Sequence, residues 1–397
     1  MDFDDTPEEA AFRHEARVWL AARARARGEG VASGASGYVG ANKVWQRTLF
    51  DGGWVGLSWP VAYGGRGLDP MRVSIFGQEH AQFGESTGVF TVAIGMVGPT
   101  LIAHGSEEQK QRYLNAMLKG DEVWCQLFSE PGAGSDLAAL GTRAEQDGDE
   151  WVVNGQKVWT SGAQNSDFGI LLARSDPDAP KHRGITCFIL DMRTPGIDVR
   201  PLRQITGTAH FNEVFLNDVR IPTANVVGAV NDGWRVAITT LTSERGAIGA
   251  AKGPIGFGEF VEAAQARGII ENPIVRQQLA HAFTRQELLR YFGLRLQSAL
   301  SQSRMPGAEA SVVKLLYSQN CERNAQLIGL LGAEGMLLDY ANSEGMALQE
   351  YFLSQWASRI GGGTDQVQRN IVGERALGLP RDSDSSRDTP WKALVKG

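Results

Sequence analysis

The spacing of apolar positions changes twice along the chain, which predicts a helical part, a β part and a second helical part. From Thr6 to about Gly120 apolar residues recur at intervals of three and four, as in amphipathic helices. Thr-Pro-Glu-Glu at residues 6–9 predicts the first helix start, because threonine caps helices and proline and acidic residues favour the first turn. Residues 54–68 are rich in glycine, proline and aromatics and predict an ordered connection. We predict an N-terminal α-helical domain over residues 1–121.

Between about Val123 and Val227 the apolar spacing falls to two, which is typical of strands. Residues 184–191 and 211–221 are predicted strands. β-Branched and aromatic residues flank Asn154-Gly155, which predicts a hairpin turn at that dipeptide. The connections are too short for helical crossovers, so the pattern predicts a middle antiparallel β domain, of barrel or sandwich type, over residues 122–230.

After Asp232 the helical spacing returns and continues to Leu377. Interruptions are expected near Gly268, near Pro306 and at the glycine-bearing stretches 329–335 and 361–363. Long amphipathic helices in series predict a C-terminal four-helix bundle over residues 231–382, followed by a mobile polar tail at 383–397. The predicted fold class is therefore α+β, with helices, an antiparallel β domain and a helical bundle in that order.

Composition and charge narrow the classes of function. Of the 397 residues 42% are hydrophobic, and the net charge of -6 comes without a basic block, which argues against disorder and against nucleic acid as a partner. The three cysteines and the scattered histidines lack the spacing of a disulfide framework or a metal site. The acidic N-terminus and the lack of an apolar run of ~18 residues predict a cytoplasmic protein without a signal peptide or membrane span.

Two stretches of the β part combine backbone freedom with hydrogen-bonding side chains. In residues 127–136 two glycines allow the backbone to approach a ligand, and Ser129 and Ser135 offer hydroxyl groups. Residues 157–162, K-V-W-T-S-G, bring an aromatic side chain and two hydroxyls to a strand end. On composition alone a tight turn is as consistent with the first stretch as a ligand-binding loop, and Trp159 fits a core position better than a cofactor platform.

Taken together, these motifs resemble the acyl-CoA dehydrogenase family. F-S-E-P-G-A-G-S-D at 128–136, N-G-Q-K-V-W-T-S-G at 154–162 and G-T-D-Q-V-Q-R-N at 363–370 occur in the family's order, with further matches at 107–114 and 370–381. The resemblance covers essentially the whole chain. It implies FAD, an acyl-CoA thioester substrate, an α-β-α architecture, a tetramer and an electron-transferring flavoprotein as the oxidant of the reduced enzyme.

The resemblance also implies roles for single residues. It places the flavin contacts on Gln126, Phe128, Ser129, Trp159, Ser161, Thr364 and Gln366. The first three would meet the flavin ring through backbone and side chains, and Thr364 and Gln366 would meet its phosphate and adenosine end. Ser135 matches a position near the CoA chain. Hydrogen-bond donors at the ring would favour the negative charge of the reduced flavin.

The implied reaction needs a carboxylate that removes the proton next to the thioester carbonyl. In many family members this base is a glutamate directly before the G-T pair, where this chain has Gly362. A minority pattern places it on an earlier helix before an arginine, which matches Glu244 and Arg245. Glu244 shares a helical stripe with Ala237 and Leu241, so we predict that it projects from an apolar face and has a raised pKa.

Alternatives remain for the residues around this base. On an arbitrary helix, a surface glutamate paired with Arg245 is commoner than a glutamate that faces the interior. Because Gly362 carries no acid, we favour the inward-facing Glu244 as the base. Arg245 is as consistent with a helix-surface position as with anchoring substrate phosphate or orienting Glu244. The N–H of Gly362 or Gly363 is the predicted hydrogen-bond donor to the thioester carbonyl.

Two segments depart from the family pattern. The family's R-K-x-F-G segment corresponds to residues 266–278, where Arg267 and Gln277 are weak substitutes, and its Q-x-x-G-G-x-G lacks the glutamine at 329–335. These departures resemble members that work as heteromeric assemblies.

The leading hypothesis is FAD-dependent α,β-desaturation of an acyl-CoA. One alternative is a superfamily variant with other flavin chemistry, and another is a subunit that mainly completes a partner's FAD site. The expected assembly is a homotetramer or a heterotetramer with a related subunit. The sequence leaves the acyl group open, although the glycines near Glu244 give room for a branched, bulky or cyclic one.

Overall fold

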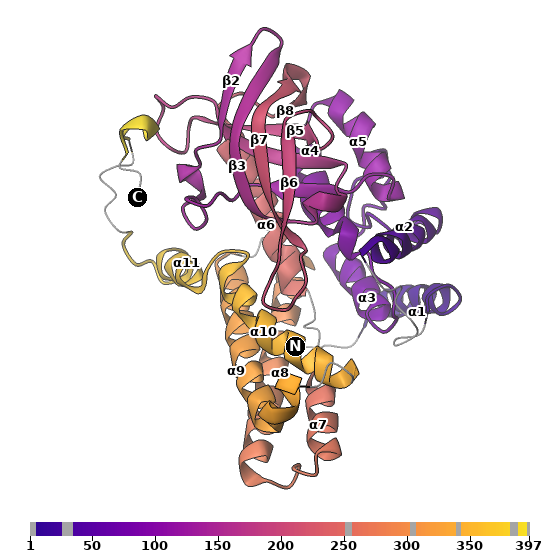
Figure 1. The fold of residues 1–397 in the computed structure, drawn as a ribbon. Helices are drawn as coiled ribbons and strands as arrows, with labels where there is room; N and C mark the ends of the chain where they lie inside the picture. Colours follow the sequence, from indigo (N-terminus) through magenta and orange to yellow (C-terminus); the bar gives the residue numbers. More distant parts are fainter. Residues whose placement is uncertain are drawn as a thin grey trace. The chain divides into compact units, whose positions relative to one another are not determined.

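The computed structural model describes residues 5–25, 35–250, 256–301, 307–338, 343–381 and 388–394. The chain forms two compact units, each described by itself. The first unit contains Met1–Leu202, Ala209–Ser243 and Ser383–Gly397, and the second contains Arg203–Thr208 and Glu244–Asp382. The predicted order of helices, sheet and helices is confirmed (Figure 1).

The helical part of the first unit begins where the sequence predicts. Its helices are α1 (Pro7–Ala21), α2 (Ala35–Asp51), α3 (Pro70–His80), α4 (Gly98–His104) and α5 (Glu107–Lys119). Thr6 caps α1 in a capping box: its side chain accepts the N–H of Glu9, and the Glu9 carboxylate accepts the N–H of Thr6. Residues 54–68 form the expected connection, which Trp54 and Trp59 fix in the core.

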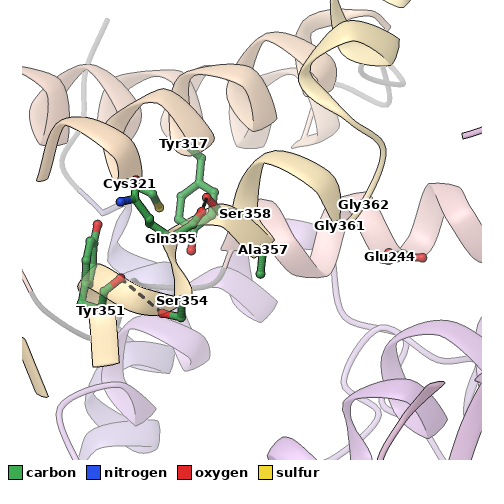
Figure 2. Close-up of a pocket in the computed structure, with 10 residues that line it drawn as sticks. All are labelled: Glu244, Tyr317, Cys321, Tyr351, Ser354, Gln355, Ala357, Ser358, Gly361 and Gly362. Carbon is green, nitrogen blue, oxygen red and sulfur yellow. Dashed lines mark hydrogen bonds between the residues drawn. The ribbon is translucent and has the colours of Figure 1, made fainter. Parts of the chain in front are cut away.

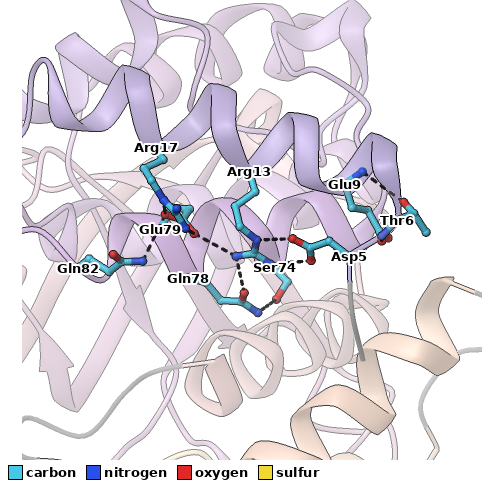
Figure 3. Close-up of polar contacts among 9 residues, drawn as sticks. All are labelled: Asp5, Thr6, Glu9, Arg13, Arg17, Ser74, Gln78, Glu79 and Gln82. Carbon is cyan, nitrogen blue, oxygen red and sulfur yellow. Dashed lines mark hydrogen bonds and ion pairs between the residues drawn. The ribbon is translucent and has the colours of Figure 1, made fainter. Parts of the chain in front are cut away.

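A buried carboxylate joins α1 to α3 (Figure 3). Glu79 of α3 is almost fully enclosed and accepts hydrogen bonds from Arg13 at 3.1 Å and from Arg17 at 2.9 Å. Arg13 also pairs with Asp5 just before α1. The neighbouring arginines lower the pKa of Glu79 despite its burial, so this carboxylate stays charged and paired at neutral pH.

One sheet makes up the β part of the first unit. Its strands are β1 (Trp124–Leu127), β2 (Arg143–Asp147), β3 (Glu150–Ser161), β4 (Phe168–Arg174), β5 (Ile185–Asp191), β6 (Ile197–Leu202), β7 (Phe211–Pro222) and β8 (Val226–Val227). The order is β6-β7-β3-β2-β4-β5-β8, and β1 pairs with β4. The strands predicted at 184–191 and 211–221 are confirmed. Most pairings are antiparallel, but β1 and one bridge of β2 run parallel to β4.

The predicted hairpin at Asn154-Gly155 is wrong. Strand β3 runs straight through this dipeptide, and the turn lies instead at Gly148, between Asp147 and Glu150. The pairing with β7 shifts register between Val153 and Gly155, which marks a bulge. A Cβ at Gly155 would lie 2.5 Å from Thr142 Oγ1, so the close approach of the residue before β2, and not a turn, requires the glycine.

The second unit consists of helices. They are α7 (Phe257–Ala266), α8 (Pro273–Ser301), α9 (Glu309–Leu338), α10 (Ser343–Ile360) and α11 (Asp365–Ile371). Breaks occur as predicted at Gly268, which ends α7 with φ of 67°, and at residues 361–363. The interruption predicted at 329–335 is present as a kink inside α9 at Gly332, and the break expected near Pro306 lies outside the described residues. Phe260, Leu327 and Tyr351 belong to the core of this unit.

Helix α6 (Gly233–Ala250) belongs to both units, with Ser243 the last residue of the first and Glu244 at the start of the second. Within the first unit, Thr240 Oγ1 lies 2.9 Å from Thr100 Oγ1, and Thr239 Oγ1 lies 2.8 Å from His104 Nε2. These hydrogen bonds tie α6 to α4. They fix the part of the helix that leads directly to Glu244.

The C-terminal segment is anchored, contrary to the predicted mobile tail. Within residues 388–394, Trp391 Nε1 donates to the carbonyl of Ala139 at 3.1 Å, and its backbone N–H donates to Ala179 at 2.9 Å. The guanidinium of Arg174 lies 4.9 Å from the Trp391 ring centroid.

Across the part of the chain that the structure describes, no helix has the length and apolar character needed to cross a bilayer.

Candidate active site

Residues 129–142, which we call the clamped loop, are held by one buried ion pair. Lys157 of β3 is fully enclosed, and its Nζ donates to Glu130 Oε1 at 2.7 Å and to the carbonyl of Phe128 at 3.1 Å. Glu130 also accepts the backbone N–H groups of Gly141 at 2.6 Å and Thr142 at 2.9 Å. A single carboxylate therefore fastens both ends of the loop to β3.

The charges of this pair control each other's pKa. Burial lowers the pKa of Lys157, because it disfavours the ammonium form, while the charge of Glu130 works against that shift. Burial also works to raise the pKa of Glu130, but the charge and hydrogen bond of Lys157 outweigh it and the pKa falls below its ordinary value. Glu130 is therefore ionised at neutral pH and continues to hold the loop.

The clamped loop and β1 carry the first group of predicted flavin contacts. Gln126 and Ser129 are half-buried, and the carbonyl of Ser129 accepts the N–H of Val158 at 2.9 Å, which aligns the loop with β3. The side chain of Phe128 is only 2% exposed and packs into the core, so any contact of Phe128 with a ligand falls to its backbone. Ser135 is exposed within the loop.

Trp159 is displayed on the surface of a mostly buried strand. Its side chain is 61% exposed, with the edge of Phe211 at 6.0 Å between ring centroids. Its φ is 61°, in the left-handed region that costs a residue with a side chain about 1–2 kcal/mol. Ser161, also exposed, follows two residues later. An indole held outward by a strained backbone beside hydroxyl groups fits the planar ring of FAD.

Residues 361–364, which we call the glycine turn, lead into α11 in the second unit. Gly362 and Gly363 have φ of 64° and 87°, so both adopt the left-handed conformation that glycine accommodates. Gln368 Nε2 donates to the carbonyl of Gly362 at 2.9 Å, and Thr364 caps α11 by accepting the N–H of Val367 at 3.2 Å. The Thr364 hydroxyl still has its proton to donate, as a phosphate contact requires. Gln366 is exposed.

A buried polar network supports the glycine turn from α9 and α10. Asp365, only 1% exposed, accepts Ser318 Oγ at 2.6 Å and Arg359 Nε at 3.2 Å, and Lys314 Nζ lies 3.5 Å away. Burial works to raise the pKa of Asp365, but Ser318, Lys314 and Arg359 together lower it. Among the described residues Lys314 Nζ and Gln368 Oε1 are buried without a hydrogen bond, so this network is incompletely satisfied.

A pocket of about 400 Å³ brings the predicted base and the glycine turn together (Figure 2). Glu244 of α6 lines it with Gly361 and Gly362, and residues of α9 and α10, including Tyr317 and Gln355, form the remaining wall. Glu244 is half-buried. The side chain of Arg245 lies outside the described residues, so its role stays a prediction.

Sequence reasoning missed several residues that shape the site. Lys157 is a charged residue at an inward position of a strand, which alternation along β3 hints at without identifying Glu130 as its partner. Asp365, Gln368 and Gln355 carry no sequence signal beyond a polar residue near the glycine turn. The sequence predicts Arg267 only as a weak substitute for the family's arginine, yet a Cβ at Gly332 would lie 3.0 Å from its Nε. The two segments that depart from the family pattern therefore meet within the second unit. Gln277 instead hydrogen-bonds His281 on α8.

Family models match the chain in three consecutive segments. The acyl-CoA dehydrogenase N-terminal domain matches residues 6–121, the middle domain residues 125–219 and the C-terminal domain residues 231–377. One relative, the acyl-CoA dehydrogenase IpdE1 of Mycobacterium tuberculosis, is 38% identical over 94% of this chain and 98% of its own.

Solved structures give the same result. The Tcur3481-Tcur3483 steroid ACAD superposes with a TM-score of 0.81 at 30% identity, covering 96% of this chain and 100% of that one. The ChsE4-ChsE5 complex from Mycobacterium tuberculosis gives 0.81 at 32% identity with the same coverage. Both names refer to two different components.

Proposed function

Because the chain belongs to the acyl-CoA dehydrogenase family, we propose that it desaturates an acyl-CoA between its α- and β-carbons, with Glu244 as the base. The observation that carries this proposal is the pocket shared by Glu244, Gly361 and Gly362. Its carboxylate comes from α6, while the position where many relatives carry the acid is glycine. The proposed base therefore comes from a different helix than in those relatives.

The proposed reaction breaks two C–H bonds and forms one C=C bond. Glu244 takes the α-proton onto a carboxylate oxygen. FAD, the cofactor of this family, supplies when bound the acceptor for the hydride that leaves the β-carbon. A backbone N–H of Gly362 or Gly363 donates to the thioester carbonyl and makes the α-proton easier to remove.

The family resemblance assigns FAD contacts to residues of the β part and to residues next to the glycine turn. The exposed indole of Trp159 would lie against the flavin ring, with Gln126, Ser129, Ser161 and the Phe128 backbone as hydrogen-bonding groups. Thr364 and Gln366 would meet the phosphate and adenosine end, Thr364 through the hydroxyl proton that its helix cap leaves over. Ser135 would contact the CoA chain, and Arg245 the substrate phosphates.

The second candidate is a role as one subunit of a heteromeric enzyme. It is favoured by the departures at residues 266–278 and 329–335 and by the likeness to the Tcur3481-Tcur3483 and ChsE4-ChsE5 proteins. In this arrangement a related subunit supplies the missing contacts to the adenosine half of FAD, and the assembly is a heterotetramer. The steroid ACAD among the relatives also favours a bulky, cyclic acyl group. An electron-transferring flavoprotein is the proposed oxidant in either case.

Anaerobic reduction of the flavin tests the role of Glu244. The purified protein is mixed with straight, branched and cyclic saturated acyl-CoAs, and bleaching of the visible flavin band is followed in a stopped-flow instrument. Glu244→Gln should slow the bleaching by about 10²- to 10⁴-fold. The exposed glutamate of α7 gives a matched control, Glu262→Gln, which should bleach at the wild-type rate.

The same experiment separates the alternatives. Bleaching that survives Glu244→Gln at the wild-type rate removes Glu244 as the base. A chain that is colourless when purified alone and yellow when purified with a related subunit supports the heteromeric role.

A further inference from the structure

The wall of the pocket formed by α9 and α10 carries a polar atom without a partner. Gln355 of α10 lines the pocket, its side chain is 9% exposed, and its Oε1 is buried without a hydrogen bond among the described residues (Figure 2). Buried amide oxygens in folded proteins nearly always have a partner, and an orphan indicates one that is missing. The position of this atom on the pocket wall indicates that the partner is a ligand.

The neighbouring serine hydroxyl groups are already engaged. Ser354 Oγ donates to the carbonyl of Tyr351 at 3.3 Å, and Ser358 Oγ donates to the carbonyl of Gln355 at 2.6 Å, both inside α10. The Tyr351 hydroxyl accepts Asn324 Nδ2 at 3.2 Å. The two serine protons therefore go to the helix backbone, and among the described residues no tyrosine hydroxyl or other group donates to Gln355 Oε1.

The remaining wall is suited to an uncharged, oxygen-bearing group. Burial raises the pKa of Tyr317 to about 12 and raises that of Tyr351 as well, so both side chains stay neutral at physiological pH. Cys321 is buried beside them. A hydrocarbon group in this pocket would leave Gln355 unpaired, whereas an alcohol would give its proton to Oε1.

We propose that Gln355 is a specificity-determining residue that selects acyl-CoA substrates whose acyl group carries a hydroxyl, which donates to Gln355 Oε1. This inference rests on the proposed function, because it assumes that the acyl group lies in the pocket that Glu244 lines. The hydroxyl sits on the acyl group away from the reacting carbons, since Glu244 and the glycine turn serve those carbons. Its carrier is a branched or cyclic acyl group, because a volume of about 400 Å³ exceeds the need of a short straight chain.

Three thioesters that differ by one ring oxygen test the proposal: a cyclohexylpropanoyl-CoA, its ring-hydroxylated analogue and its ring keto analogue. The wild-type protein should use the hydroxylated compound with kcat/KM about 10- to 100-fold above that for the other two, because only the hydroxyl donates to an amide oxygen. Gln355→Leu should abolish this preference, so that the hydroxylated compound loses its advantage in kcat/KM. Gln349→Leu, on the same helix but outside the pocket lining, should keep the wild-type preference.

Binding gives a second readout that does not depend on turnover. Calorimetric titration of Glu244→Gln with the same thioesters should give the lowest Kd for the hydroxylated compound. Equal kcat/KM and Kd for the three compounds, or a preference unchanged by Gln355→Leu, overturns the role of Gln355 while the desaturation stands. A preference for the keto analogue also overturns it, because the amide then donates its NH₂ in place of accepting. If no acyl-CoA bleaches the flavin in any variant, the proposed function itself fails, and the inference fails with it.

Discussion

The clamped loop and the glycine turn are held by buried charged groups in two different ways. Each is a glycine-bearing segment beside a buried carboxylate and a buried lysine. In the clamped loop Glu130 hydrogen-bonds Lys157 at 2.7 Å and takes two backbone N–H groups as well. At the glycine turn Lys314 lies 3.5 Å from Asp365 and, among the described residues, lacks a hydrogen bond.

The two regions therefore differ in whether their buried charged groups have hydrogen bonds before a ligand binds. Folding alone gives both Glu130 and Lys157 their hydrogen bonds, so the two ends of the clamped loop are fixed before any ligand arrives. Around the glycine turn, Lys314 Nζ, Gln368 Oε1 and Gln355 Oε1 stay unpaired within the described residues, which is a cost that a bound ligand or neighbouring subunit can relieve. We therefore expect the first region to govern stability and the second to respond more strongly to ligands.

Breaking the clamped loop should have the largest effect. Lys157→Met leaves the Glu130 carboxylate buried and unpaired, so we expect the free energy of unfolding to fall by about 3–5 kcal/mol. Urea denaturation followed by tryptophan fluorescence measures the change. The double variant Lys157→Met/Glu130→Gln should recover part of it, because the uncompensated charge is gone. A loss below about 1 kcal/mol in the single variant would show that the pair is not the main clamp.

The acid at the glycine turn should show its contribution in the pH dependence of stability. The folded pKa of Asp365 lies below its unfolded value, so its ionised form stabilises the protein above that unfolded value and the stabilisation is lost as the pH falls through the folded pKa. Asp365→Asn should cost about 1–3 kcal/mol at neutral pH, and the difference from wild type should shrink below about pH 4. Urea titrations across this range measure it. A difference that is constant with pH would contradict an ionised Asp365.

The smallest effect compares one glycine from each region. A Cβ at Gly363 would lie 2.7 Å from Gln368 Nε2 at a φ of 87°, so Gly363→Ala should cost about 1–2 kcal/mol. In the clamped loop a Cβ at Gly132 meets nothing within 4 Å and its φ lies outside the left-handed region, so Gly132→Ala should change stability by less than about 0.5 kcal/mol. Thermal unfolding of the two variants decides it, and equal losses would mean that the turn tolerates side chains.

Local signals in the sequence predicted much of the fold. The helix start at Thr6 and the strands around 184–191 and 211–221 depend on nearby residues, and these predictions are confirmed. The prediction at Asn154-Gly155 is wrong because the same dipeptide suits a bulge, and the approach of Thr142, which decides between bulge and turn, comes from the loop before β2. The tail was predicted as mobile because its anchor, Trp391 against Arg174, joins residues more than two hundred positions apart.

The candidate site likewise has features that the sequence indicates and features that it does not. Glu244 lines one pocket with Gly362, and its role as the base stays a prediction that rests on a helical stripe and a family pattern. The unpaired oxygen of Gln355 and the network around Asp365 could not be predicted, because they arise where α9, α10 and α11 pack together. Whether a buried polar atom has a hydrogen-bond partner depends on three-dimensional packing, and the helical period of the sequence does not indicate it.

The anchored C-terminal segment makes the first unit discontinuous in sequence. Trp391 is fastened to Ala139 and Ala179, so residues 388–394 pack with a part of the chain that lies more than two hundred positions earlier. The last residues of a domain are ordinarily poorly ordered unless contacts tie them down, and Trp391 makes such contacts here. A single tryptophan therefore lets residues from near the end of the sequence contribute to a unit that the sequence begins.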